Sequence, residues 1–244
     1  MRATAGRLLL IGVLGVTLVG LVGCGGDKTG GPIGPPGDIV ARAPDATYGA
    51  RTAEVLITAT TANARGVVDL ARRDGRLAVL APGHPKAADL VITGGAGYVK
   101  GASDPAYVPL GGSVPPVLRG GDPWADIDLV RGTVHVRSDG GAEVDGASTL
   151  GYTLTVDPQQ AIDTTPSLRQ DAVRAALAGR SMMFTMAVWI DSRFRLRRIE
   201  VPSDFSFKST TPPTRVDGRT IATDVDFVAF IAQASPVTRP PGLN

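Results

Sequence analysis

A period of two runs through the stretch Leu150-Gly151-Tyr152-Thr153-Leu154-Thr155-Val156. The first, third, fifth and seventh of these residues are apolar, so in a strand they would share one face, with the two threonines on the other. Such one-sided alternation is typical of an antiparallel sheet that has one covered face and one face in water. The stretch therefore predicts a sheet with a single buried face.

The segments on either side continue this pattern. Within 132–138, Val134 and Val136 alternate with polar residues and are predicted to share the covered face of a strand. After an intervening helical segment, a further strand again places its apolar side chains on one face: Met186, Val188 and Ile190. A turn follows this strand, and Arg198 then breaks the alternation, which predicts a bulge.

A meander of strands precedes these segments. Alternation predicts strands over 52–60, 66–72, 76–81, 89–93 and 98–100. Asp74-Gly75 and Gly94-Gly95 have the composition of hairpin turns and lie between predicted strands. Near the C-terminus, Thr220–Ile231 is apolar on both faces, which predicts a strand inside the sheet.

Two regions change to a helical period. A short helix is predicted over Asp38–Ala46, with Asp38 as N-cap and Pro44 near its end. Further on, Asp157-Pro158 and Thr165-Pro166 each place a capping residue before a proline, as at the start of a helix. The second of these helices, 166–178, has an apolar stripe that predicts packing on the sheet: Leu168, Ala172, Val173, Ala176 and Leu177. The fold class is therefore predicted as α+β.

Trp124 follows a Gly-Gly-Asp-Pro turn and begins a segment in which apolar and acidic residues alternate. Trp124 would either line the rim of a pocket or plug the end of the core. Asp126 and Asp128, with Asp122 nearby, lack the glycine and glutamate of a calcium-binding loop. We expect these carboxylates on the wet face of a strand, and no metal site is predicted.

The N-terminus has the pattern of a secretory signal. Arg2 and Arg7 precede the apolar run Leu8–Val19, which closes on Leu21-Val22-Gly23-Cys24 and is too short to span a bilayer comfortably. The last four residues resemble a bacterial lipobox, whose cysteine is acylated, for example by palmitate, and becomes the new N-terminus. Cys24, the only cysteine, is therefore expected to anchor the protein to the outer face of the plasma membrane. The alternative is an ordinary signal peptide with a chance cysteine.

Removal of residues 1–23 would leave 221 residues with a formal charge of zero, because the signal carries two arginines and no acidic residue. A neutral chain gives no electrostatic case for a nucleic-acid partner. Residues 24–37, rich in Gly and Pro, predict a flexible tether, 38–235 a single domain, and 236–244 a disordered tail.

Residues for catalysis are sparse. The chain has two histidines, His84 and His135, and no His-Glu-x-x-His, Gly-x-Ser-x-Gly or P-loop pattern. We therefore predict no enzyme activity and no cofactor. Arg193, Arg195 and Arg197 recur with a period of two and would either meet anionic lipid headgroups or lie on an ordinary solvated face.

The order of these elements resembles the LppX/LprAFG family of mycobacterial and other actinobacterial lipid-carrier lipoproteins. The resemblance covers about residues 38–231 and rests on the lipobox cysteine, Trp124 with its Gly-Asp-Pro lead-in, Asp145-Gly146 before the stretch 150–156, and Val188-Trp189-Ile190 before a hairpin. It implies a strongly curved antiparallel half-barrel with a few short helices on its concave face. An apolar cavity between the two layers would take the acyl chains of lipids or glycolipids for transport across the cell envelope.

Under this resemblance the cavity would be lined by Trp124, Val134, Val136, Leu150, Tyr152, Leu154, Val173, Leu177, Met186, Val188 and Ile190. The implied partners are a lipid or glycolipid ligand, the plasma membrane through acylated Cys24, and a membrane transporter. From the residues alone, the same apolar faces could fill an ordinary core. The main alternative is thus a non-catalytic lipoprotein interaction module, and a hydrolase is the remaining one.

Overall fold

The computed structural model describes residues 31–59, 63–80, 88–110, 122–177, 181–202, 214–216, 219–231 and 237–241. Its strands are β1 (Thr52–Ala59), β2 (Asn63–Asp69), β3 (Asp74–Leu80), β4 (Ala88–Thr93), β5 (Ala96–Gly101), β6 (Val108–Pro109), β7 (Thr133–Val144), β8 (Ala147–Val156), β9 (Phe184–Asp191), β10 (Leu196–Pro202), β11 (Thr214–Val216) and β12 (Arg219–Ile231). Its helices are α1 (Pro36–Gly49), α2 (Pro123–Leu129), α3 (Pro158–Thr164) and α4 (Ser167–Leu177), with a 3-10 turn, η2 (Val130–Gly132), after α2.

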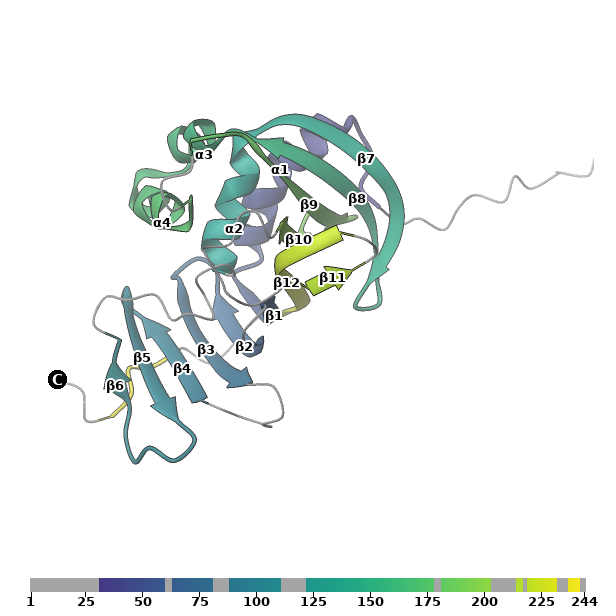
Figure 1. Ribbon diagram of the computed structural model, residues 1–244. Coiled ribbons are helices and arrows are strands. Elements are labelled where there is room, and N and C mark those ends of the chain that lie inside the picture. The colour runs from purple at the N-terminus through teal and green to yellow at the C-terminus, as the bar shows by residue number, and fades with distance from the viewer. Residues whose placement is uncertain are drawn as a thin grey trace, which may run out of the picture.

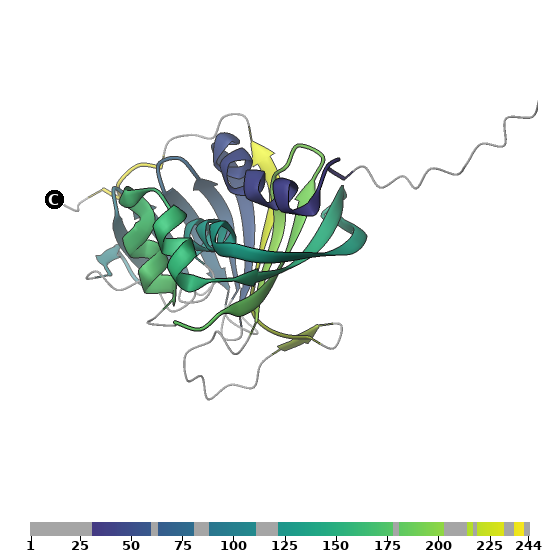
Figure 2. The same cartoon turned by 90° about the horizontal axis from the view of Figure 1, so that it is seen from above.

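The strands form one antiparallel sheet in the order β6-β5-β4-β3-β2-β1-β12-β10-β9-β8-β7, with β11 paired to β12. Figure 1 shows that the sheet is open and strongly curved, with β7 and β8 arching over at one end and α1 and α2 inside the curve. Figure 2, in which the molecule is seen from above, shows α1 lying across the strands. The predicted α+β fold with a curved antiparallel sheet and short helices is confirmed.

One face of the sheet is buried from strand to strand. Leu154 pairs with Met186, and Tyr152 with Val188, across β8 and β9. These side chains belong to a single hydrophobic cluster that extends to β1–β4 and to the helices. As predicted, β12 lies inside the sheet, between β1 and β10. The predicted bulge is present as well, because the register between β9 and β10 shifts between Leu196 and Arg198.

The hairpin between β2 and β3 turns earlier than predicted. Asp74 and Gly75 are the first residues of β3, where Asp74 pairs with Asp69. The turn lies at 70–73, and Arg73 adopts the left-handed conformation there, with φ of 58°. Asp74 is instead fixed by its carboxylate, which accepts a hydrogen bond from the Gly94 N–H at 3.0 Å. Gly94-Gly95 forms the β4–β5 turn as expected, with φ of 58° and 78°.

Helix α1 is longer than predicted. It begins at Pro36 rather than at an Asp38 cap and runs through Pro44 to Gly49. Burial of Ile39, Val40 and Pro44 itself offsets the hydrogen bond that proline cannot donate. The Thr47 hydroxyl then ties α1 to the sheet, since its Oγ1 accepts a hydrogen bond from the Leu196 N–H at 2.9 Å.

The segment predicted as an alternating strand at 124–130 is helical. The Asp122 carboxylate accepts hydrogen bonds from the N–H groups of Trp124 (3.0 Å) and Ala125 (3.1 Å), and Pro123 is the first helical residue. This cap outweighs the short alternation that suggested a strand. Asp122, Asp126 and Asp128 therefore belong to the start and body of α2, not to a wet strand face.

Helix α3 begins where its capping signal placed it, whereas α4 begins at Ser167, one residue later than predicted, and the Thr165 hydroxyl donates to the Ala161 carbonyl of α3 at 2.7 Å. Asp157 caps α3 by accepting from the Gln159 N–H at 2.8 Å. In α4, Val173 and Leu177 are buried, but Leu168 is 95% exposed. The prediction that α4 packs on the sheet through its whole stripe is wrong, because α4 packs mainly against α2 and α3.

Several predictions lie outside the described residues, namely the signal peptide, Cys24, His84 and the first half of the tether (24–30). No helix among the described residues is long and apolar enough to cross a membrane. The domain boundaries remain predictions, and so does the disordered tail, of which residues 237–241 are described. There the Arg239 guanidinium lies 5.5 Å from the centre of the Tyr98 ring.

Candidate ligand-binding cleft

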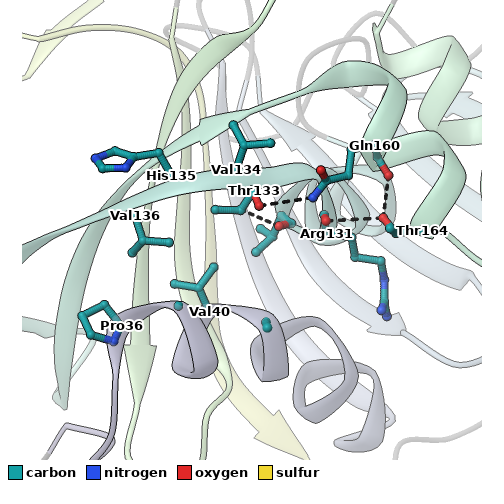
Figure 3. Close-up of a pocket in the computed structure, with 12 residues that line it drawn as sticks. Pro36, Val40, Arg131, Thr133, Val134, His135, Val136, Gln160 and Thr164 are labelled. Carbon is teal, nitrogen blue, oxygen red and sulfur yellow. Dashed lines mark hydrogen bonds between the residues drawn. The ribbon is translucent and has the colours of Figure 1, made fainter.

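A cleft of about 620 Å³ lies between α1 and the start of β7. It is lined by residues of α1, η2, β7 and α3: Pro36, Gly37, Val40, Ala41, Val130, Arg131, Thr133, Val134, His135, Val136, Gln160 and Thr164. Figure 3 shows an apolar end at Pro36 and Val136, and a polar end where Arg131, Gln160 and Thr164 gather. The cleft is therefore amphiphilic along its length.

A β-bulge at the start of β7 sets the direction of its valines. The register with β8 shifts between Thr133 and His135, so that Val136 pairs with Leu154 on the buried face. Val134 is the extra residue, is 45% exposed, and in Figure 3 lies on the other side of the strand from Val136. The prediction that the two valines share a face is wrong, because it assumed unbroken alternation through this segment.

Hydrogen bonds to the backbone hold the polar end together. Gln160 Nε2 donates to the Thr133 carbonyl at 3.3 Å. The Thr164 hydroxyl lies 2.6 Å from the Gln160 carbonyl and 3.3 Å from the Arg131 carbonyl. The Thr133 hydroxyl donates to the Val130 carbonyl at 2.6 Å. These bonds fix α3 against η2 and the first residue of β7 (Figure 3).

Arg131 is the cation of the cleft, and two carboxylates engage it. Its Nε donates to Asp128 Oδ1 at 3.0 Å, and its Nη2 donates to Asp45 Oδ1 at 2.5 Å. Burial acts to lower the pKa of Arg131, but the hydrogen bonds to Asp45 and Asp128 outweigh it and raise that pKa. The guanidinium is therefore charged, and that charge is compensated.

Asp128 joins three helices beside the cleft although its side chain is only 1% exposed. Besides Arg131, it accepts a bidentate pair from Arg169, at 2.7 and 3.1 Å, and a bond from the Tyr48 hydroxyl at 2.9 Å. The Arg169 guanidinium also lies 4.2 Å from the centre of the Tyr48 ring. Burial and the charge of Asp128 raise the pKa of Tyr48 well above its usual value, so the hydroxyl remains a donor. The network ties α1, α2 and α4 together.

Asp126 is the other buried carboxylate of α2. It is 4% exposed, and its Oδ2 has no hydrogen-bond partner among the residues that the structure describes. Burial, followed by the nearby charge of Asp122, raises the pKa of Asp126 well above its usual value. Within the same described residues, no group of three His, Cys, Asp or Glu side chains is arranged to hold a metal ion.

Most of the predicted cavity residues lie together in the packed core: Trp124, Tyr152, Leu154, Val173, Leu177, Met186, Val188 and Ile190. Val136 and Leu150 pack against this cluster from its margin. Only Val134 and Val136 of the predicted set also line the cleft. Cavity lining by the remaining residues stays a prediction.

Two of these residues are covered by neighbours far away in the sequence. Trp124 is 2% exposed, and its Nε1 donates to the Asp69 carbonyl at 3.2 Å. Leu150 lies against the N-terminal segment, because a Cβ added to Gly31 would come within 2.4 Å of the Leu150 Cγ. Trp124 is therefore held against the end of β2, and Leu150 is partly covered by the N-terminal segment.

The three arginines predicted to meet headgroups lie around the β9–β10 hairpin, and two of them have partners within the fold. Arg195 Nη2 donates to Asp191 Oδ2 at 2.8 Å, and its guanidinium lies 4.3 Å from the centre of the Phe230 ring. Arg197 is 7% exposed and donates to the Val228 carbonyl at 3.0 Å. Arg193 lies in the turn itself. Headgroup contact by these residues stays a prediction.

Sequence reasoning missed most of the cleft. Arg131, Gln160 and Thr164 come from η2 and α3, and the opposite wall comes from α1. No local sequence pattern predicts a cleft between elements that are so far apart in the sequence. The only available signals were Asp157-Pro158, which placed a helix directly after β8, and Val40 on the apolar side of the first predicted helix.

No protein-family model and no curated protein matches the chain. Among solved structures, it is similar to LprF from Mycobacterium bovis, with a TM-score of 0.50 and 16% identity over 87% of this chain and 100% of that one. It is also similar to the Mycobacterium tuberculosis lipoprotein LppX, with a TM-score of 0.48 and 14% identity over 78% and 92% of the two chains. A LolA superfamily protein from Nitrosomonas europaea matches with a TM-score of 0.33 and 12% identity over 85% and 99%. The resemblance to the LppX/LprAFG lipoproteins is confirmed at the level of the fold.

Proposed function

We propose, from the fold that this chain shares with LprF, that it is a membrane-anchored lipoprotein that binds the acyl chains of a lipid or glycolipid for transport across the cell envelope. The lipobox ending at Cys24 supports attachment to the outer face of the plasma membrane. The ligand would come from, or pass to, a membrane transporter. In this proposal the chain is not an enzyme and needs no cofactor.

The cleft between α1 and β7 is the observation that carries the proposal. Its volume of about 620 Å³ lies within the range of small-molecule sites. Pro36 and Val136 offer apolar surface to an acyl chain, and burial of that surface is worth about 25 cal/mol per Å². The polar end beside them suits a headgroup. An amphiphile matches both ends at once.

Native mass spectrometry tests the proposal on residues 24–244 carrying Cys24→Ser, produced in an actinobacterium. We expect adducts of lipid mass that disappear on denaturation and can be identified after extraction. Val136→Trp should fill the apolar end and lower the bound fraction, whereas Val108→Trp, on the exposed strand β6, should not. A clean unliganded mass for the unsubstituted chain would reject lipid binding.

The second candidate is a non-catalytic interaction module, which is favoured by the close packing of the apolar layer. Leu154→Trp and Val188→Trp separate the two functions, because both side chains are fully buried. If the apolar layer opens to admit an acyl chain, both variants should fold but bind less lipid. If it is an ordinary core, overpacking should cost about 1–3 kcal/mol or prevent folding, with no folded form that lacks lipid. Thermal unfolding monitored beside lipid content distinguishes these outcomes.

A further inference from the structure

The polar end of the cleft presents three side-chain oxygens that can accept a hydrogen bond from a ligand. The hydroxyl hydrogens of Thr133 and Thr164 are already given to backbone carbonyls, so each oxygen is left as an acceptor. Gln160 donates through Nε2, and its Oε1 accepts no hydrogen bond from any residue that the structure describes. A ligand that carries hydroxyl groups can therefore donate to these three oxygens.

Arg131 does not supply a free positive charge to such a ligand. Its guanidinium lies between Asp128 and Asp45, and Asp128 also pairs with Arg169. These four side chains, two arginines and two carboxylates, together carry no net formal charge. His135, the other ionisable lining residue, is set apart from the polar end in Figure 3.

These two features disfavour a phosphate headgroup. An ionised phosphate has no donor for these oxygens, and it would lose water without gaining an uncompensated cation. Hydroxyl groups can donate to Gln160 Oε1 and to the threonine oxygens at no such cost. The Asp45 carboxylate, whose side chain is 77% exposed, is the partner that an anion would have to displace from Arg131.

We propose that Asp45, by neutralising Arg131, makes the cleft select an uncharged, hydroxyl-bearing headgroup and reject an anionic one. The inference rests on the proposed function, since it assumes that the acyl chain lies at the apolar end. Asp45 is then a specificity-determining residue, and Gln160 contacts the headgroup directly.

A competition between two lipids with the same acyl chains tests this proposal. Delipidated residues 24–244 carrying Cys24→Ser are offered monoglucosyl dioleoylglycerol and dioleoylphosphatidylglycerol, and bound masses are compared by native mass spectrometry. We expect the glucosyl lipid to bind about tenfold more tightly, the size of one hydrogen bond gained. Asp45→Asn should shift the preference toward the phosphate lipid, whereas Asp38→Asn, an equal charge change at an exposed site on the same helix, should not.

A second pair of variants tests the direct contact. Gln160→Ala should weaken binding of the glucosyl lipid about tenfold, while Gln159→Ala, its neighbour outside the cleft, should leave that binding unchanged. Equal or tighter binding of the phosphate lipid by the unsubstituted chain would overturn the inference and leave the proposed function standing. An unchanged preference in Asp45→Asn would overturn the role of Asp45. Binding of neither lipid would overturn both proposals.

Discussion

The two longest strands of the sheet, β12 and β7, have opposite surroundings. β12 has 13 residues, lies between β1 and β10, and buries Val225 and Phe227 completely. β7 has 12 residues, pairs only with β8 at the edge of the sheet, and has Val144 as its one buried side chain. Figure 1 shows the same contrast, with β12 in the middle of the sheet and β7 arching at its end.

The difference between these strands shows why the cleft lies where it does. β7 carries the polar run 137–141 and shifts register with β8 twice, between Thr133 and His135 and between Ser138 and Gly140. Charges and bulges are common on edge strands because they prevent pairing with other chains. With no second neighbour, β7 can stand away from α1, and the space between them is the cleft.

The largest expected effect comes from the centre of the comparison. Phe227→Ala on β12 should lower the free energy of unfolding by about 3–5 kcal/mol, because the ring is fully buried and the surrounding strands cannot close the cavity. The variant also loses the stacked contact with Phe230, whose ring centre is 6.1 Å away. Urea unfolding measures the change. A loss below about 1 kcal/mol would contradict the packed position of β12.

The next effect concerns the ion-pair network beside the cleft, which ties α1, α2 and α4 together. Asp128→Ala should cost about 3 kcal/mol, since it leaves Arg131 and Arg169 without their shared carboxylate in a partly buried site. Urea unfolding again gives the value. Asp171→Ala, which removes the almost fully exposed partner of Arg174 on α4, serves as the control and should cause no measurable change.

The outer face of β12 should make stability depend on pH. Burial, followed by the charge of Asp226, raises the pKa of Asp224 from 3.8 to about 7. The folded chain then binds more protons than the unfolded chain between these values. The stabilisation is therefore complete below pH 3.8, falls as the pH rises through the window and is lost above pH 7.

Substitution of this carboxyl group should remove the slope. Asp224→Asn should flatten the dependence and stabilise the chain at pH 8 by about 2 kcal/mol, as measured by urea unfolding at pH 5 and pH 8. Asp226→Asn is the contrasting variant and should destabilise, because Asp226 accepts a bidentate pair from Arg198 at 2.6 and 2.9 Å. An unchanged slope in Asp224→Asn would assign the pH dependence to another group.

The buried middle of the sheet could be predicted from the sequence because it depends on local alternation. The stretch 150–156 identified the covered face, and Thr220–Ile231 identified a strand with neighbours on both sides. Prediction failed where one residue changed the backbone. Arg73 takes the left-handed turn that was assigned to Asp74-Gly75, and the Asp122 cap starts a helix where alternation suggested a strand.

The candidate site could not be predicted in the same way. The cleft depends on a single extra residue in β7, on the distance between β7 and α1, and on an ion pair that joins Asp45 to Arg131 across 86 positions. None of these three features produces a periodic pattern of apolar and polar residues from which it could be predicted. Alternation with polar neighbours correctly placed Val136 on the buried face, whereas Val134 was assigned to the same face because the sequence gives no sign of the bulge.

The smallest effect tests that bulge with a matched pair of variants on β7. Val136→Ala should cost about 1 kcal/mol, because Val136 pairs with Leu154 and packs against the core. Val134→Ala should change stability by less than about 0.5 kcal/mol, since Val134 is 45% exposed. Equal losses in urea unfolding would mean that both valines face α1. In that case β7 would have no bulge and would pack closely on α1. The space between β7 and α1 that forms the cleft would then have no structural cause.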